Sequence, residues 1–404
     1  MTTKDSLRTS LPTVDLLIQW QSLVVPNYRS FFRELAKHPG WTVSMIAPDK
    51  FREGGMQELE CAPNDPRNPP LTVLPVKRFH TQAVWFDGLL KALRSWLQKP
   101  AERKVYFCFT EPYALTAIFS WMTLVCARIM SGFGGPKPIF LLYGFQNIYK
   151  QFPLPLRLVQ GLMFHVADGI FVAGSEHEAV LRRHGYKGPC IRLPMWFDPE
   201  VFTPDDAGHD GDIRIGYAGS LLPEKGITQL LDSLIEHPES LRGCTFDVAG
   251  GGQLKDEISE KVQRLLSKGV NARFLGSISS SDMAGFYRGI DILIVPSRTA
   301  QHWKEQFGRV IVEAMASGVA VIGSDSGEIP FVIADPERVF PENDMVRLTQ
   351  VLTLAVESVR HGRTRERERV SQDATTRFAD HRVARQMASD IEGLLDTHGR
   401  RQLT

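Results

Sequence analysis

The chain has 404 residues, 43% of them hydrophobic, and a formal net charge of +1. That length is too great for one ordinary core and predicts two domains of about 200 residues each. The near-zero charge does not indicate the basic face that nucleic-acid-binding proteins usually carry, so nucleic acid is not an expected partner. The five cysteines are scattered and odd in number, which indicates free buried thiols in a reducing compartment and therefore a cytoplasmic protein.

Two segments bear on a relation to membranes. Residues 1–15 are polar and carry no apolar core, so they predict no secretory signal. Residues 113–130 approach the length of a membrane span, but Ser120, Arg128 and several threonines interrupt the run. This pattern favours a helix buried against a parallel sheet. A contact of the segment with a membrane surface stays open as an alternative.

In the first half, short apolar runs predict strands at 14–20, 41–48, 104–110, 138–143 and 169–175. Residues 51–70 are rich in Pro, Asn and Gly, which predicts a long loop. Around 194–211, prolines, aspartates and glycines break both the helix and the strand pattern. This stretch is therefore predicted to be an interdomain linker.

The second half alternates strands and helices more regularly. Strands are predicted at 213–218, 245–249, 272–275, 291–296 and 319–323, and helices at 226–237, 253–267, 281–288 and 309–317. The alternation predicts an α/β fold with a parallel, doubly wound sheet, which binds ligands beyond the carboxyl ends of its strands. The alternating arginines and glutamates at 360–370 indicate a solvated helix surface.

The predicted architecture is thus two doubly wound, Rossmann-like domains that face each other across a cleft. We expect a first domain over 1–200 and a second, ligand-binding domain over 208–375. A C-terminal helix over 376–404 is expected to cross back to the first domain.

The most informative stretch is Glu305–Ser324, EQFGRVIVEAMASGVAVIGS. Phe307 and Gly308 precede a short predicted helix, whose N-terminus offers unpaired backbone N–H groups and a positive dipole end to a diphosphate. Glu305 lies just before the helix and Glu313 lies about one turn inside it. The two carboxylates therefore reach opposite sides of a ligand lying across the helix N-terminus, where they can accept hydrogen bonds from sugar hydroxyls.

This stretch resembles the E-x7-E signature of retaining glycosyltransferases, specifically glycosyltransferase family 4, and its flanks FGRV and EAMASG also match. The alternative is an ordinary strand–loop–helix with two surface glutamates. The resemblance implies the two-domain GT-B fold. It also implies that Glu305 contacts the donor sugar near the reacting centre and that Glu313 binds the ribose. The donor diphosphate and sugar would be lined by Phe307, Gly308, Arg309 and Val310.

Further matches follow in the family's order. The segment GSLLPEKG resembles the family loop in which an arginine and a lysine neutralise the donor phosphates; Gly219 and Lys225 match, but Ser220 stands at the arginine position. Two cations normally meet the charge of the leaving nucleotide. Lys304, Arg298 or Arg309 would then replace the missing arginine, or the site is weakened. By resemblance, Gly250 belongs to a glycine turn and Ile278 lies beside the nucleobase.

In the first half the resemblance is looser. Residues 167–186 and 195–204 match family segments, and Glu111, Gln146 and Asn147 fall at the acceptor-side edges. The glycine-rich first loop of the family is missing and Leu23–Tyr28 (LVVPNY) replaces it. A histidine found in some members has no match. Asp210-Gly211-Asp212 satisfies a D-x-D metal pattern, but it lies in the linker, so no metal site is expected.

The resemblance covers roughly residues 12–395 and implies an enzyme with Glu305 and Lys225 at its catalytic centre. The expected reaction is transfer of a sugar, with retention, from a UDP- or GDP-sugar to a glycan or lipid-linked acceptor, as in cell-surface polysaccharide or glycolipid synthesis. No cofactor or metal is expected, and peripheral contact with the inner face of the cytoplasmic membrane is compatible. Two alternatives stay open: a catalytically silent GT-B scaffold, and a nucleotide-sugar epimerase or hydrolase.

Overall fold

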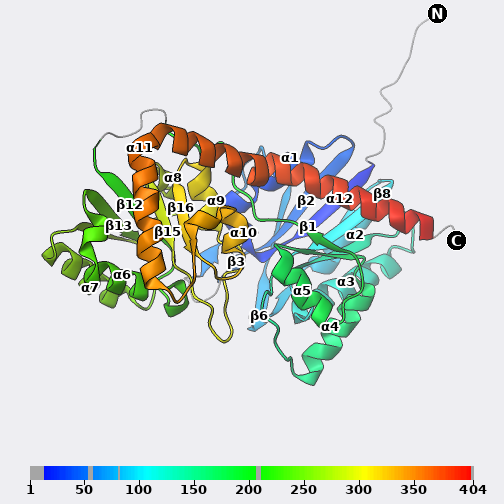
Figure 1. Cartoon of the computed structure of the whole chain (residues 1–404). Coiled ribbons are helices and arrows are strands. Elements are labelled where there is room, and N and C mark those ends of the chain that lie inside the picture. The colour runs from blue at the N-terminus through cyan, green and yellow to red at the C-terminus, as the bar shows by residue number, and fades with distance from the viewer. Residues whose placement is uncertain (1–12, 53–57, 81, 206–210, 402–404) are drawn as a thin grey trace, which may run out of the picture.

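The computed structural model describes residues 13–52, 58–80, 82–205 and 211–401. Two α/β halves lie side by side, and a long C-terminal helical segment runs along both of them (Figure 1). Each half contains one mainly buried parallel sheet covered by helices, which is the doubly wound arrangement that the alternation of strands and helices predicts.

The first half is built on a parallel sheet of seven strands. In sheet order the strands are β11 (Cys190–Arg192), β10 (Gly169–Val172), β9 (Ile139–Gly144), β8 (Arg103–Cys108), β1 (Val14–Gln19), β2 (Trp41–Pro48) and β5 (Leu71–Leu74). Its helices are α1 (Ser30–Ala36), α2 (Leu89–Gln98), α3 (Leu115–Met130), α4 (Leu154–Val166) and α5 (Ser175–Arg183). The central strands β1 and β9 are buried along their whole length, as a sheet covered on both faces requires.

Two short antiparallel hairpins complete the first half. They pair β3 (Lys50–Phe51) with β4 (Leu59–Glu60), and β6 (Val76–His80) with β7 (Ala83–Phe86). The described residues of the region 51–70, which are 51–52 and 58–70, are therefore largely irregular, as expected, but they contribute one strand end and β4 to a hairpin.

The second half is a parallel sheet of six strands. In sheet order these are β14 (Asn271–Gly276), β13 (Cys244–Ala249), β12 (Ile213–Ala218), β15 (Ile292–Val295), β16 (Ala320–Ser324) and β17 (Val339–Phe340). Its helices are α6 (Ile227–Glu236), α7 (Lys255–Ser267), α8 (Met283–Arg288), α9 (Arg309–Ala316) and α10 (Ile329–Ile333). Because the strands are parallel, the loops after β12, β13 and β15 all lie at the same edge of the sheet, where ligands bind in such folds.

The C-terminal segment joins the two halves. Helix α11 (Met345–Phe378) lies on the second half and bends at Gly362, whose backbone is not helical. Helix α12 (Asp380–Arg401) packs against α1 of the first half. Glu392 on α12 accepts a hydrogen bond from Trp41 Nε1 at 3.3 Å, and Asp396 pairs with Arg103 at 2.8 Å.

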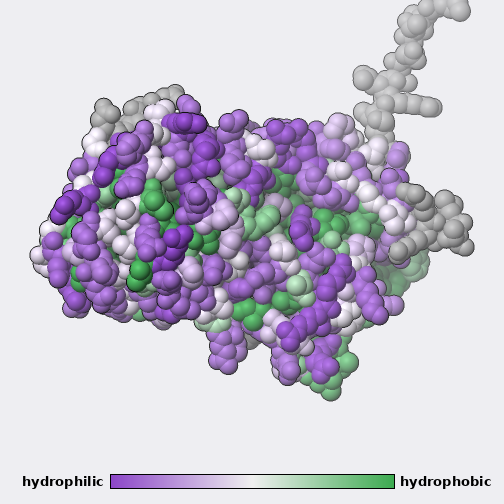
Figure 2. All heavy atoms as spheres, viewed as in Figure 1, coloured by the Kyte–Doolittle hydropathy of each residue, from purple (hydrophilic) through white to green (hydrophobic). Residues whose placement is uncertain are grey.

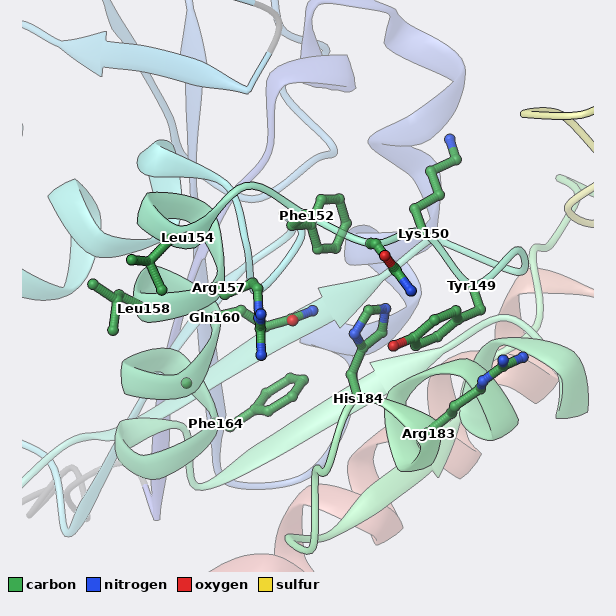
Figure 3. Close-up of a pocket in the computed structure, with 12 residues that line it drawn as sticks. Tyr149, Lys150, Phe152, Leu154, Arg157, Leu158, Gln160, Phe164, Arg183 and His184 are labelled. Carbon is green, nitrogen blue, oxygen red and sulfur yellow. The ribbon is translucent and has the colours of Figure 1, made fainter.

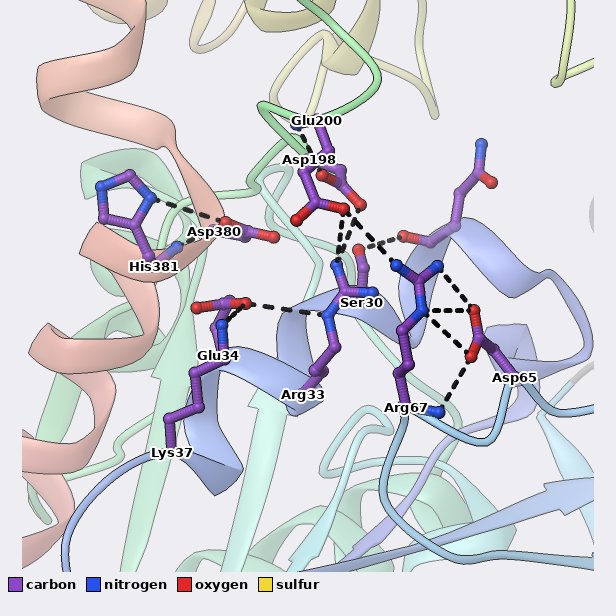
Figure 4. Close-up of polar contacts among 11 residues, drawn as sticks. Ser30, Arg33, Glu34, Lys37, Asp65, Arg67, Asp198, Glu200, Asp380 and His381 are labelled. Atoms are coloured by element: carbon purple, nitrogen blue, oxygen red, sulfur yellow. Dashed lines mark hydrogen bonds and ion pairs between the residues drawn. The ribbon is translucent and has the colours of Figure 1, made fainter.

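The linker region is held by both charge and apolar packing. Arg33 on α1 lies 3.5 Å from Asp198 and 3.7 Å from Glu200, as Figure 4 shows. Phe197 forms a parallel bridge with Ala379 between α11 and α12. One continuous buried cluster runs from the first sheet through Trp196 and Phe202 into the second half. The two halves are therefore packed against each other and not merely tethered.

Three expectations need correction. Helix α3 buries one face, including Leu124, but exposes Met122 and Ile129 on the other, so residues 113–130 are only half covered. The cysteines are free, but Cys126 is exposed. The region 360–370 is mainly exposed, yet Arg367 is buried within it. Among the described residues, no helix is long and apolar enough to cross a membrane.

Candidate active site

The loops that follow β12, β13 and β14 are joined to one another by backbone hydrogen bonds. Gly219 N donates to Ala249 O at 3.1 Å, and Gly250 N donates to Gly276 O at 2.8 Å. A side chain at Gly250 would come within 2.0 Å of Gly219 O, so only glycine permits this approach. The predicted donor residues Gly219, Ser220 and Gly250 therefore form one rigid rim at the carboxyl edge of the second sheet.

The two residues predicted to be catalytic meet on this rim. Lys225, in a 3-10 turn after β12, places its Nζ 2.7 Å from Glu305 Oε2. The same carboxylate oxygen accepts a hydrogen bond of 2.9 Å from Ser297 Oγ, which follows β15. Lys225 Nζ also lies 4.5 Å from the centre of the Trp303 ring. The ammonium and the carboxylate are thus fixed by residues of two loops of the second domain, those after β12 and β15, and only 10% of the Glu305 side chain is exposed.

Helix α9 begins directly beyond this pair. Its N-cap is Gly308, whose φ of +81° lies in the left-handed region that favours glycine. Val310 in the first turn is half-buried, whereas Phe307 is buried against Phe378 and presents no open face. Ile278 is half-buried in the loop after β14. The helix N-terminus and the Lys225–Glu305 pair therefore lie at one corner, where the backbone N–H groups at the start of α9 supply the positive end of a helix dipole.

Glu313 lies inside the helix and points into the protein. Its carboxylate accepts a hydrogen bond from Arg309 at 2.7 Å and one from the Tyr287 hydroxyl at 3.3 Å. Burial lowers the pKa of Arg309, but Tyr28 and Glu313 outweigh that cost and raise it overall. Arg309 thus stays charged and is held in place by Glu313.

The first domain reaches this corner through Tyr28. The Arg309 guanidinium lies 4.4 Å from the centre of the Tyr28 ring, and Trp20 packs edge-on against the same ring at 4.7 Å. Tyr28 ends the segment Leu23–Tyr28, which stands where the resembled family has a glycine-rich loop. A bulky aromatic side chain thus covers the start of α9 where glycines would leave the backbone open.

The three cations suggested as replacements for the missing arginine at Ser220 each have another partner. Lys304 forms an ion pair with Glu176 of the first domain. Arg298 donates to Asn343 Oδ1 at 2.6 Å, on the surface. Arg309 is paired with Glu313, as described above. The group that lies beside the Lys225 ammonium is instead the aromatic ring of Trp303.

Several contacts cross between the domains at the same place. Asn147 Nδ2 donates to the backbone oxygen of Glu305 at 2.8 Å. Glu328, in the loop after β16, accepts a hydrogen bond of 2.9 Å from the backbone N–H of Glu176 at the start of α5. A side chain at Gly174 would come within 2.2 Å of the Glu328 carboxyl. The loops after β15 and β16 of the second domain thus contact the first domain directly.

The acceptor-side residues Glu111, Gln146 and Asn147 also come together. Glu111 follows β8 and accepts a hydrogen bond of 2.9 Å from Phe145 N, at the end of β9. Burial raises the pKa of Glu111 to about 8, despite the opposing effects of that bond and of Lys150. Gln146 Nε2 is buried without a hydrogen-bond partner in the described part of the chain. Glu111 is therefore largely protonated at neutral pH.

Four contributors to the site were not identified from sequence: Tyr28, Ser297 as a carboxylate partner, Trp303 and Glu328. Ser297 and Glu328 follow the strands predicted at 291–296 and 319–323, so the sequence indicated loops at the ligand-binding edge of the sheet but no role for these two side chains. Tyr28 and Trp303 gave none. Within the described ranges, no group of three or more His, Cys, Asp or Glu residues is placed to hold a metal ion. Asp210 of the D-x-D pattern lies outside the described residues.

The sequence comparisons with known proteins all find glycosyltransferases. The family model for glycosyl transferases group 1 matches residues 203–377. A D-inositol 3-phosphate glycosyltransferase of Streptomyces avermitilis is 28% identical over 204 residues, which cover 45% of this chain and 43% of that protein. A phosphatidyl-myo-inositol mannosyltransferase of Mycobacterium tuberculosis is 32% identical over 191 residues, covering 46% and 48% respectively. The chain spans about half the length of the curated relatives it matches.

Among solved structures, Anabaena Alr3699/HepE in complex with UDP and glucose matches with a TM-score of 0.62 and 16% identity, over 94% of this chain and 99% of that one. At that identity the match establishes the fold, and it covers both domains. Residues 203–377 thus match the glycosyl transferases group 1 family model, and the chain has a GT-B fold of two facing Rossmann-like domains.

Proposed function

We propose that the chain is a retaining glycosyltransferase that moves a sugar from a UDP- or GDP-sugar to a glycan or lipid-linked acceptor, in cell-surface polysaccharide or glycolipid synthesis. The observation that carries this proposal is the pairing of Lys225 with Glu305, at 2.7 Å, beside the N-terminus of α9. The glycosyltransferase and mannosyltransferase activities of the two relatives and the UDP bound to HepE support it.

The leaving diphosphate meets positive charge from two sources, Lys225 Nζ and the backbone N–H groups at the start of α9. Glu305 has one oxygen held by Lys225 and Ser297, which leaves the other for a donor-sugar hydroxyl. Glu313 fixes Arg309 and accepts from Tyr287, so its role on the ribose side uses the acceptor capacity that these two hydrogen bonds leave on the carboxylate. The donor phosphate takes the acceptor proton, so the protein supplies no nucleophile. Because the chain's own groups balance the developing charge, we propose that no metal ion is needed.

The acceptor enters from the first domain, past Glu111, Gln146 and Asn147. We assign this domain to residues 1–200 and the donor domain to 208–375, with 376–404 returning to the first domain. The packing of α12 on α1 supports that division. A lipid-linked acceptor places the enzyme in the cytoplasm, in peripheral contact with the inner face of the membrane.

The test is nucleotide binding followed by turnover. UDP, GDP, ADP and dTDP are compared by thermal shift, because a ligand at a hundred times its dissociation constant adds about 2.7 kcal/mol of stability. We expect one nucleotide to shift the wild type and a Lys268→Ala control, and to shift Lys225→Ala much less. Loss of one such electrostatic contact costs about 10² to 10³ in rate.

The outcomes separate the alternatives. Absence of any nucleotide shift would favour the silent scaffold. Release of free sugar or of an epimer, with no transfer to any acceptor, would favour the hydrolase or epimerase. Near-full turnover by Lys225→Ala would remove Lys225 from the catalytic centre, because its charge would then do nothing for the leaving group.

A further inference from the structure

One part of the first domain has an unusual distribution of charge. Residues 112–167 contain no aspartate or glutamate, although acidic residues make up 46 of the 404 in the chain. The same stretch contains Arg128, Lys137, Lys150 and Arg157. It forms α3, β9 and α4, and α3 packs against α4. This face is therefore positive within a chain that is close to neutral.

The same face exposes large apolar side chains. On α4, Leu154 is 64% exposed and Leu158 66% exposed, and Leu162 continues the stripe one turn later. The spacing of four residues puts all three on one side of the helix. Figure 2 shows hydrophobic atoms at the surface over the lower end of the first domain, where α4 lies in Figure 1. Five more exposed apolar residues lie on or after α3: Met122, Val125, Ile129, Met130 and Phe133.

Between α4 and α5 lies a cavity of about 570 Å³, shown in Figure 3. It is large enough for a small ligand or headgroup. Three cations line it, Lys150, Arg157 and Arg183, and none of the described residues that line it is acidic. Leu154 and Leu158 line the same cavity, so it opens at the apolar stripe.

The wall of the cavity is rigid on the α5 side. Arg183 lies over the Tyr149 ring at 4.0 Å, and His184 is stacked between Tyr149 and Phe152 with ring centres 4.5 and 5.5 Å away. His184 Nε2 is buried and has no hydrogen-bond partner among the described residues. Burial and the charge of Arg183 lower the pKa of His184. Three positively charged side chains thus lie at the cavity, which also contains a polar atom, His184 Nε2, that no described residue satisfies.

The cavity connects to the proposed reaction centre through one loop. This loop, residues 145–153, carries Asn147, which donates to the backbone of Glu305, and then Lys150 and Tyr149 of the cavity. Lys150 also acts electrostatically on Glu111 at the acceptor edge. A molecule held in the cavity is therefore one loop away from the acceptor edge.

We propose that the α3–α4 face docks on an anionic membrane, and that the cavity between α4 and α5 binds the phosphate of an anionic phospholipid. Apolar side chains beside a basic surface are the features of helices that lie in a membrane interface. Each lysine or arginine near an anionic surface contributes about 1 kcal/mol, or roughly fivefold in affinity. The inference rests on the peripheral membrane contact of the proposed function and names the surface and the lipid chemistry involved.

The experiment is flotation of the full chain with vesicles of phosphatidylglycerol and phosphatidylcholine, compared with vesicles of phosphatidylcholine alone. We expect the wild type to float with the anionic vesicles only, and Arg157→Glu and Leu158→Glu each to lose at least about tenfold in binding. The matched controls are Arg365→Glu and Leu354→Glu on α11 of the second domain, both exposed, which keep wild-type binding.

Several results would overturn the proposal. Equal flotation with neutral vesicles, or an equal loss of vesicle binding by the α11 controls, would show that binding is not specific to the α3–α4 face. Binding of inorganic phosphate without any vesicle binding would make the cavity a free-anion site. A wild-type dimer that Leu158→Glu dissociates, with no vesicle binding, would make the stripe a self-association surface. Nucleotide thermal shifts measured on the same samples show whether the donor site stands when the membrane site fails.

Discussion

Replacing Glu111 by glutamine tests the charge state of the acceptor edge. Glu111 is 8% exposed, and burial raises its pKa to about 8, from an ordinary value of 4.5. Between these two pH values the folded protein binds more protons than the unfolded chain. Stability therefore falls as pH rises through this window, and it levels off above the folded-state pKa.

The magnitude follows from the size of that shift. Each pKa unit corresponds to about 1.4 kcal/mol, so full ionisation of Glu111 costs on the order of 5 kcal/mol. Glutamine carries no charge and keeps an oxygen that can accept the hydrogen bond from Phe145 N. Between pH 5 and about 8.5, we expect the free energy of unfolding to fall by several kcal/mol less in Glu111→Gln than in the wild type.

The assay is urea unfolding at half-unit steps of pH, with the slope of each transition checked for constancy. Other titrating groups act equally in both proteins, including Asp380, whose pKa burial raises to about 7, so the difference isolates Glu111. Parallel pH profiles for wild type and variant, within about 1 kcal/mol, would refute the buried, protonated state of Glu111. Acceptor turnover that falls above pH 8 in the wild type alone would tie that proton to function.

Three further predictions follow from single contacts. Gly308→Ala places a side chain at a φ of +81° and within 2.7 Å of Ile311 Cδ1. We expect the free energy of unfolding in urea to fall by about 1–2 kcal/mol and nucleotide binding to weaken. Unchanged nucleotide binding would show that α9 is not part of the donor site. Lys104→Ala leaves the buried Asp15 without its ion pair of 2.9 Å, and a loss below about 1 kcal/mol in the same assay would contradict the expected 3–5 kcal/mol. Glu328→Ala removes a charged hydrogen bond between the domains, worth about 1.5–3 kcal/mol, and it should raise the radius of gyration measured by small-angle scattering if this contact holds the domains together.

The second domain was the more predictable half of the fold. Five of its six strands were expected within one residue of their observed bounds, and four of these five (β12, β13, β15 and β16) are buried apolar runs, whereas β17 was not identified. In the first domain β2 was also located correctly at 41–48, but β5, β6 and β7 were not identified. Those short strands lie among prolines and charges, where alternation is weak, and tertiary pairing decides the structure.

The exposure of α3 shows a different limit. Periodicity identifies an apolar helix, but this run is apolar on nearly all sides, so no pattern states which face is covered. A buried helix and a helix with one face open for docking then have the same sequence pattern. Only the packing of α2 and α4 around it shows that Met122 and Ile129 stay outside.

At the site, each local motif predicted the functional residues of its own loop but not the residues elsewhere in the chain that contact them. Glu305 and Lys225 were expected from two separate motifs, and the structure brings them into contact. Tyr28 and Glu328 act across the domain boundary, on residues more than 100 positions away, where sequence carries no spacing signal. These contacts share a direction: Asn147, Tyr28 and the start of α5 all contact the second domain at Glu305, Arg309 or Glu328. In the proposed function the first domain therefore does more than present an acceptor, because it also determines how Glu305 and Arg309 are held. A change at Tyr28 or Gly174 should alter donor binding even though neither residue lies in the domain that is proposed to bind the nucleotide.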